Sequence, residues 1–177
     1  YAVKASALNG SYRYDDKPVV FVNWFDACRF TNWLHNGQGG PGTTESGAYT
    51  LSGGAPAQPN AGSISRNTGA RWWLPNENEW YKAAYFDSAA GSYYDFPTRT
   101  NNTPNNNLPA NDSGNSANFR QGNISTTGNS SYPLTDAGAY SLSVSPYGTL
   151  DQGGNVEEWN ESLFATISGG LSFRGLR

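Results

Sequence analysis

The chain has 177 residues, a formal net charge of −3 at pH 7 and a mean hydropathy of −0.65. This length is enough for one domain with a hydrophobic core, and an aromatic content of 14% argues against a disordered chain. The basic residues form no cluster, which argues against nucleic acid as a partner, and no apolar run approaches the length of a membrane span.

The cysteine and histidine content limits which metal sites and disulfides the chain can form. There is one cysteine, Cys28, and one histidine, His35. An internal disulfide, a metal held by a cysteine pair and a multi-histidine zinc or iron site are therefore excluded. The sequence contains no methionine and no signal peptide, so we interpret it as a processed form or a fragment.

Residues 17–37 predict a strand followed by a helix. The run Val19–Val22 is interpreted as a short buried strand. Asn23 begins a capping-box variant, so we expect a helix from about Trp24 to Leu34, with Phe30, Trp33 and Leu34 facing the core. His35 and Gly37 suit the end of that helix.

A second strand and helix are predicted further along, after a loop-rich segment that contains one possible strand at Tyr49–Leu51. Residues 71–74 are interpreted as a buried strand, with Trp72 in the core. Asn76 and Glu79 form a second capping box before a helix over about 77–85, which places Trp80 and Ala84 on one face.

Residues 91–146 show almost no periodicity, and residues 101–115 are rich in asparagine. We interpret the asparagines as turn formers, with sugar binding as the alternative. A long segment without regular structure fits a compact domain only if bound ions or loop–loop packing hold the loops.

The stretch "LDQGGNVEEWNES", residues 150–162, is the strongest candidate for a binding loop. A turn at Gly153-Gly154 brings the carboxylates of Asp151 and Glu158 together with inward carbonyls, which are the oxygen ligands that calcium prefers. The residues alone leave open a simple glycine turn with solvated acids. Cys28 is interpreted as a small buried hydrophobe and His35 as part of the helix cap.

Five segments together carry a resemblance to a known family. They read "KPVVFVNWFDACRFTNWLHNGQ", "GAYTLSG", "WWLPNENEWYKAAYFD", "SANF" and "SPYGTLDQGGNVEEWNES". In order and spacing they are similar to the formylglycine-generating enzyme or sulfatase-modifying-factor domain, and to its secreted bacterial branch. The resemblance implies one α+β domain over residues 1–177, incomplete at both ends. The implied fold is a loop-rich variant of the C-type-lectin-like fold with two helices and small twisted antiparallel sheets.

The resemblance also implies calcium and a set of site residues. One calcium site corresponds to the side chains of Asp151 and Glu158 and the carbonyls of Gly154 and Val156. A second site corresponds to Asn118 and the carbonyl of Phe119, but its remaining ligands fall at residues 128–133, where no carboxylate stands. The expected aromatic core is formed by Trp24, Trp33, Trp72, Trp80 and Trp159.

Two departures from the family bear on function. Glu157 stands where the family has tryptophan, and the cysteine pair that binds copper in the family would fall beyond Arg177. Copper is therefore not expected in this chain. The prediction is a non-catalytic, calcium-stabilised extracellular module that binds an unknown protein or glycan or assembles into a surface structure. The alternatives are a truncated formylglycine-generating enzyme and a lectin-like domain.

Overall fold

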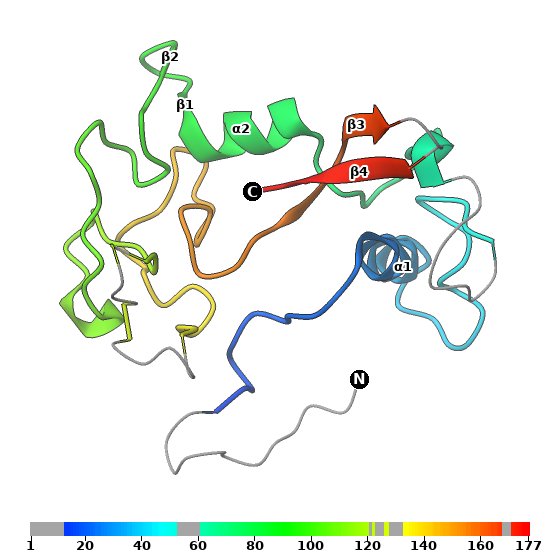
Figure 1. The fold of residues 1–177 in the computed structure, drawn as a ribbon, viewed down its shortest axis with the longest axis horizontal. Helices are drawn as coiled ribbons and strands as arrows, with labels where there is room; N and C mark the ends of the chain where they lie inside the picture. Colours follow the sequence, from blue (N-terminus) through cyan, green and yellow to red (C-terminus); the bar gives the residue numbers. More distant parts are fainter. Residues whose placement is uncertain (1–12, 53–60, 121, 123–125, 128–132, 168–170) are drawn as a thin grey trace. The chain divides into compact units, whose positions relative to one another are not determined.

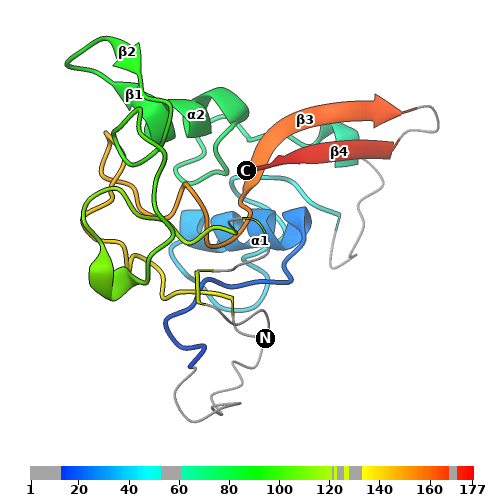
Figure 2. The same ribbon diagram turned by 60° about the vertical axis from the view of Figure 1, so that its left-hand side comes forward.

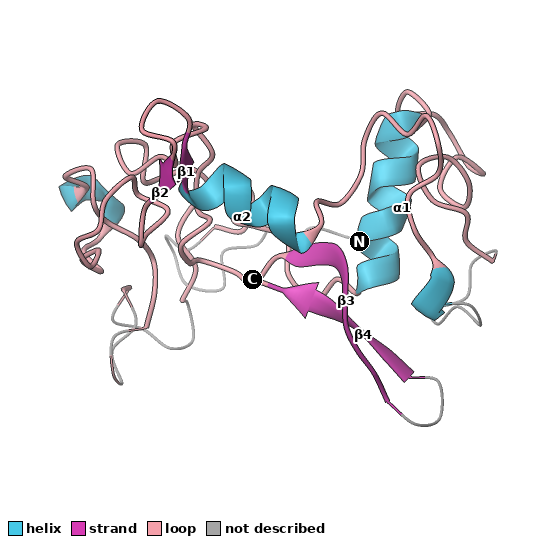
Figure 3. Ribbon diagram, turned by 90° about the horizontal axis from the view of Figure 1, so that it is seen from above, coloured by secondary structure: helices cyan, strands magenta, loops and turns pink. Residues whose placement is uncertain are grey.

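The computed structural model describes residues 13–52, 61–120, 122, 126–127, 133–167 and 171–177. These residues separate into two compact units. The first comprises residues 1–20 and 81–157, and the second comprises residues 21–80 and 158–177. Most of the described chain is loop (Figure 3). The prediction that the chain is one incomplete domain stays a prediction.

Regular structure is limited to a few short elements. The described helices are α1 (Trp24–His35), α2 (Glu77–Tyr85) and two 3₁₀ turns, η1 (Ala61–Ser63) and η2 (Pro109–Asn111) (Figure 1). The strands form two antiparallel pairs, β1 (Phe86–Asp87) with β2 (Ser92–Tyr93) and β3 (Trp159–Ile167) with β4 (Leu171–Leu176). The loop-rich α+β class is therefore confirmed. No helix in the described ranges has the length and apolar character needed to cross a membrane.

Both predicted capping boxes are present. In α1, Asn23 Oδ1 accepts from the N–H of Asp26 at 2.9 Å, and the carboxylate of Asp26 accepts from the N–H of Asn23. In α2, Asn76 Oδ1 accepts from the N–H of Glu79 and the Glu79 carboxylate accepts from the N–H of Asn76, both at 2.9 Å. Each box satisfies two N–H groups at a helix start, which fixes where the helix begins.

The end of α1 is also as predicted. Gly37 has a φ of 74°, a conformation that costs glycine little. The N–H of Gln38 donates to Trp33 O at 2.8 Å and that of Gly37 donates to Leu34 O at 3.1 Å. These are the two bonds of a Schellman motif, which satisfies carbonyls that a helix end leaves free.

The hydrophobic core of the second unit forms around α1. Trp24, Cys28, Ala48, Tyr49, Leu51 and Ile64 make up its buried cluster, and Trp159 is among the partly buried residues that contact it. Two indole groups fasten the segment that contains β3 to this core. Trp24 Nε1 donates to Asn160 O at 3.1 Å, and Trp159 Nε1 donates to Val22 O at 3.0 Å.

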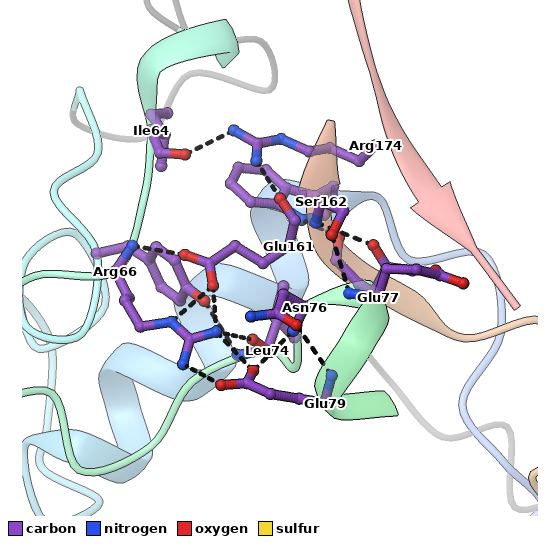
Figure 4. A network of polar contacts seen from close by, with 12 residues as sticks. Ile64, Arg66, Leu74, Asn76, Glu77, Glu79, Glu161, Ser162 and Arg174 are labelled. Atoms are coloured by element: carbon purple, nitrogen blue, oxygen red, sulfur yellow. Dashed lines mark hydrogen bonds and ion pairs between the residues drawn. The ribbon is translucent and has the colours of Figure 1, made fainter. Parts of the chain in front are cut away.

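The hairpin of β3 and β4, shown in orange and red in Figure 2, is also held by charged side chains. Arg66 lies between two carboxylates, as Figure 4 shows. Its Nε donates to Glu161 at 2.7 Å, and its two terminal nitrogens donate to the two oxygens of Glu79 at 3.0 and 2.7 Å. The guanidinium group of Arg174 bonds to the carbonyls of Ile64 and Glu161. These contacts connect β3 and β4 to the loop before α2 and to the first turn of α2.

Three expectations about burial are wrong. Val19–Val22 forms no strand, Val19 and Phe21 are 69% and 97% exposed, and Phe21 has a φ of 60°. A strand residue does not adopt that φ, and the run pairs with no strand in the described part of the chain. In α1, Phe30 is 57% exposed and Trp33 is only partly buried, because the buried face consists of Trp24, Cys28, Thr31 and Asn32.

The third error concerns Trp72, which is 55% exposed and does not belong to the core. Residues 71–74 form no strand, and two of their N–H groups bond to side chains. The N–H of Arg71 donates to His35 Nδ1 at 3.1 Å, and the N–H of Leu74 donates to the hydroxyl of Tyr49 at 3.0 Å. Without a neighbouring strand, this segment has no alternation of buried and exposed residues. Trp24 and Trp80, by contrast, are 4% and 5% exposed.

Candidate functional site

The loop predicted to bind calcium forms a tight double turn in the first unit. The N–H of Gly154 donates to Asp151 O at 3.2 Å, and the N–H of Val156 donates to Gly154 O at 2.9 Å. Asp151 and Asn155 have φ values of 61° and 68°. Asp and Asn tolerate this left-handed region better than other side chains, so the residue types fit the turn.

Asp151 carries a half-buried carboxylate. Its Oδ2 accepts from the N–H of Gly138 at 2.6 Å. Burial raises the pKa of Asp151 above its ordinary value, and the bond from Gly138 only partly offsets that effect. Within the described ranges, no cationic side chain pairs with this carboxylate. The desolvated negative charge is therefore only partly compensated, by the N–H of Gly138.

The carboxylate of Asp151 also affects the pKa of a neighbouring tyrosine. Tyr140 is 2% exposed, and its hydroxyl donates to Asn107 O at 2.7 Å. Burial, together with the carboxylates of Asp112 and Asp151, raises the pKa of Tyr140 to about 12. The surroundings of Asp151 thus disfavour a second negative charge.

Gly154 is required by a close backbone approach. A Cβ atom at this position would lie 2.1 Å from the carbonyl oxygen of Asn118, a contact that cannot form without moving backbone. The N–H of Asn155 donates to that same carbonyl at 2.7 Å. The loop predicted to bind calcium and the loop segment at Asn118 are therefore in direct contact within the first unit.

Side-chain amides strengthen this contact. Asn118 Nδ2 donates to Pro133 O at 2.9 Å and to Asn155 Oδ1 at 3.0 Å. Asn155 Oδ1 also accepts from the N–H of Thr135, and Asn155 Nδ2 donates to Thr135 O. Asn155 belongs to the motif at residues 150–162, but the sequence alone predicts no role for it. In the structure it joins three segments that lie far apart in the chain.

The first two residues of the second predicted calcium site, Asn118 and Phe119, both lie in the first unit. Phe119 O accepts a hydrogen bond from the hydroxyl of Thr126 at 3.2 Å, and the same hydroxyl accepts from the N–H of Phe119. The carbonyl predicted as a metal ligand thus already has a polar partner. Of the remaining predicted positions, residues 128–132 lie outside the described residues.

A small pocket opens beside Asp151 in the first unit. Its cavity volume is about 10 Å³. Asp151, Gly153 and Gly154 line it together with Asn118, and Ser116 and Tyr140 are also among its lining residues. Three of the residues implied by the resemblance, Asp151, Gly154 and Asn118, therefore share one pocket.

Glu158, the fourth predicted ligand of the first calcium site, belongs to the second unit. Its Oε2 accepts a hydrogen bond from Trp80 Nε1 at 2.6 Å. Its backbone exchanges hydrogen bonds with Arg177 beyond β4. Glu157, which replaces the family's tryptophan, is exposed.

Cys28 and His35, the other residues that could carry chemistry, have structural roles. Cys28 is fully buried, and this burial raises the pKa of its thiol well above the ordinary value. A buried protonated thiol is not a nucleophile. His35 is the last residue of α1, as expected for part of its end, and its Nδ1 accepts from the N–H of Arg71.

A metal site built from the described residues would combine carboxylates with other oxygen ligands. Among the described residues, no three side chains of His, Cys, Asp or Glu lie close enough to hold an ion together. A carboxylate combined with carbonyl oxygens is the type of site that calcium takes. The loop at residues 151–156 offers that combination.

Comparison with protein-family models supplies the classification. Residues 4–177 match the sulfatase-modifying factor enzyme 1-like domain. The chain belongs to this family. Neither the comparison with curated proteins nor the comparison with solved structures finds a match. The resemblance predicted from five motifs is thereby confirmed for the family, while its secreted bacterial branch and the link to the lectin-like fold stay predictions.

Proposed function

We propose that this sulfatase-modifying-factor domain is a non-catalytic, calcium-stabilised module that acts outside the cell as a binding or structural unit. The observation that carries the proposal is Asp151. Its carboxylate is half-buried, receives one hydrogen bond from Gly138, and has no cationic partner in the described ranges. A bound cation compensates such a charge more fully than one N–H group does.

The loop fits calcium in its residue types. Asp151 would supply a carboxylate oxygen, and Gly154 and Val156 would supply carbonyl oxygens, with Glu158 as the expected fourth ligand. The carbonyl of Gly154 accepts from Val156, but a carbonyl oxygen has two lone pairs and can also bind an ion. When bound, calcium would neutralise Asp151 and cross-link the turn, and it would take part in no reaction.

The non-catalytic part of the proposal rests on the cysteine chemistry of the family. That chemistry uses a cysteine pair, whereas the 177 residues contain only Cys28, which is buried and protonated. The extracellular location is supported by the calcium site itself. Extracellular modules function with calcium sites of modest affinity, because calcium is abundant there.

A formylglycine-generating enzyme of which these residues are a part is the second candidate, and the match over residues 4–177 favours it. The sequence of the complete gene separates the two. A cysteine pair encoded after Arg177 would support the enzyme and contradict the non-catalytic proposal.

Calcium binding is tested by thermal melting of the purified protein in excess calcium and in excess chelator, with bound metal measured by elemental analysis. At a calcium concentration of about 100 times Kd, binding stabilises the folded state by about 2.7 kcal/mol. For a protein of this size that corresponds to a rise in Tm of roughly 5–11 °C. An unchanged melting curve together with no bound metal would contradict the proposal.

Two variants and one control sharpen this experiment. Asp151→Asn keeps an oxygen that accepts from Gly138 but removes the charge, so it should abolish most of the calcium-dependent rise in Tm. Glu158→Ala should remove most of it as well. Asp95→Asn changes an exposed aspartate of the same unit and should leave the rise unchanged.

A further inference from the structure

Three consecutive residues of the second unit, Arg71, Trp72 and Trp73, are all exposed. Trp72 and Trp73 are 55% and 41% exposed, although tryptophan is among the side chains that bury the most area when they are covered. The indole of Trp72 forms no hydrogen bond and stacks on no other ring within the described ranges. A contiguous aromatic surface that its own chain leaves uncovered points to a partner outside the chain.

The segment that carries these side chains is anchored on both sides. The N–H groups of Arg71 and Leu74, which flank the two tryptophans, bond to side chains at 3.1 and 3.0 Å. The guanidinium group of Arg66 lies 4.9 Å from the ring centroid of Trp73. A surface that is already ordered loses less conformational freedom when a ligand binds, so this arrangement favours binding.

Arg71 adds a positive charge that no acidic side chain neutralises. One terminal nitrogen of its guanidinium group donates to His35 O. No carboxylate forms an ion pair with it in the part of the chain that the structure describes. A guanidinium group has five N–H donors in a planar fork that matches a carboxylate, so donors remain for a ligand. Arg66, by contrast, already pairs with Glu79 and Glu161.

An open indole beside an unpaired guanidinium group fits a carboxylated sugar. The face of an aromatic ring carries partial negative charge and attracts the polarised C–H groups of a pyranose ring. A uronic acid carries a carboxylate on that same ring, and arginine binds a carboxylate through two parallel hydrogen bonds. An acidic peptide also offers carboxylates, but protein anchors bind best in well-packed pockets, whereas Trp72 is open to solvent.

We propose that Arg71, Trp72 and Trp73 form a binding site for an acidic polysaccharide, in which Trp72 stacks on a uronic acid ring and Arg71 binds its carboxylate. The inference rests on the binding role in the proposed function and names a ligand class for it, but it does not involve calcium. Because the ion pair is exposed to solvent, binding weakens as the salt concentration rises.

Isothermal titration calorimetry with two matched hexasaccharides tests the proposal. One is cellohexaose, and the other is the same chain with each hydroxymethyl group oxidised to a carboxylate. The two probes share their rings and linkages, so a difference in affinity reports the charge. We expect the oxidised hexasaccharide to bind at least about 10-fold more tightly than cellohexaose at low salt, and this ratio should fall at high salt.

Single substitutions separate the two contributions. Trp72→Ala should raise the Kd of the oxidised hexasaccharide by at least about 10-fold, as expected for a tryptophan that dominates a binding surface. Arg71→Gln should remove the preference over cellohexaose, and Arg71→Lys should restore part of it, because lysine keeps the charge but not the planar fork. Tyr147→Ala and Arg99→Gln change an exposed aromatic side chain and an exposed arginine of the first unit, and should leave the Kd within about 2-fold.

The outcomes distinguish this inference from the proposed function. Equal affinity for the two hexasaccharides, or for hexaglutamate and the oxidised hexasaccharide, would overturn the inference, and the latter result would indicate an acidic peptide as the partner. If neither hexasaccharide binds while calcium raises the Tm, the inference is wrong and the calcium-stabilised module stands. If the oxidised hexasaccharide binds as expected and calcium does not bind, the calcium part of the proposed function fails and the inference stands.

Discussion

Asn32 should be one of the most sensitive positions in the second unit. It is fully buried in α1, and both ends of its amide bond to the loop that follows the helix. Its Nδ2 donates to Thr44 O and its Oδ1 accepts from the N–H of Tyr49, each at 2.7 Å. This single side chain therefore holds the loop that places Tyr49 in the core.

The cost of Asn32→Ala follows from these two bonds. The N–H of Tyr49 lies at a fully buried residue, and leaving it without an acceptor costs about 1–3 kcal/mol. Loss of the bond to Thr44 costs about 1 kcal/mol more, and the better helix propensity of alanine returns about 0.5 kcal/mol. The expected loss is about 1.5–3.5 kcal/mol, or a fall in Tm of roughly 3–14 °C for a protein of this size.

Urea denaturation and thermal melting followed by circular dichroism would measure this loss. Asn36→Ala is the matched control, because Asn36 has the same side chain on the same helix end and also donates to two loop carbonyls, of Thr43 and Ser46, but is exposed. Water replaces its bonds, so the loss should stay below about 1 kcal/mol. Equal losses in the two variants would refute the reasoning from burial.

Three further predictions concern the loops and the charge network. Gly154→Ala should destabilise by at least about 2 kcal/mol in denaturant titration, because its Cβ collides with the carbonyl of Asn118, whereas Gly40→Ala meets open space and should be nearly neutral. Burial raises the pKa of Asp151, so the calcium-free folded state keeps a proton that the unfolded chain has released, and stability should fall as pH rises through the window between the two pKa values. This fall should be absent from Asp151→Asn. Glu161→Gln should cost about 2 kcal/mol, since its carboxylate, with a side chain only 10% exposed, accepts charge-assisted bonds from a guanidinium group; a loss within 0.5 kcal/mol would contradict that role.

Local signals in the sequence predicted the helices well. The pairs Asn23 with Asp26 and Asn76 with Glu79 act within one helical turn, so the residues that decide the helix start are all present in a short window. The burial of individual side chains could not be predicted in this way. Whether Trp72 lies inside depends on whether a strand runs beside it, and a window of four residues does not contain that information.

The same limit applies to the candidate site, where the motif residues could be predicted from the sequence and their partners could not. Asp151, Gly154 and Val156 follow from a motif of contiguous residues. Their partners do not, because Gly138 stands 13 positions before Asp151, and Asn118 stands 36 positions before Gly154, in segments without periodicity. Contacts of that kind are set by the course of long loops, and only the three-dimensional structure reveals them.

The division of the second unit into residues 21–80 and 158–177 has a consequence for synthesis. A ribosome that adds about 5–20 residues per second needs roughly 4–15 s to make the intervening residues. Throughout that interval the indole of Trp24 lacks the acceptor that Asn160 later provides, and Val22 O lacks its donor from Trp159. The buried cluster around Trp24 lies within residues 21–80, so during this interval it lacks only the apolar contact that Trp159 later makes with it. A chaperone that shields aromatic surface would act in this window, and a translational pause within residues 81–157 would prolong it.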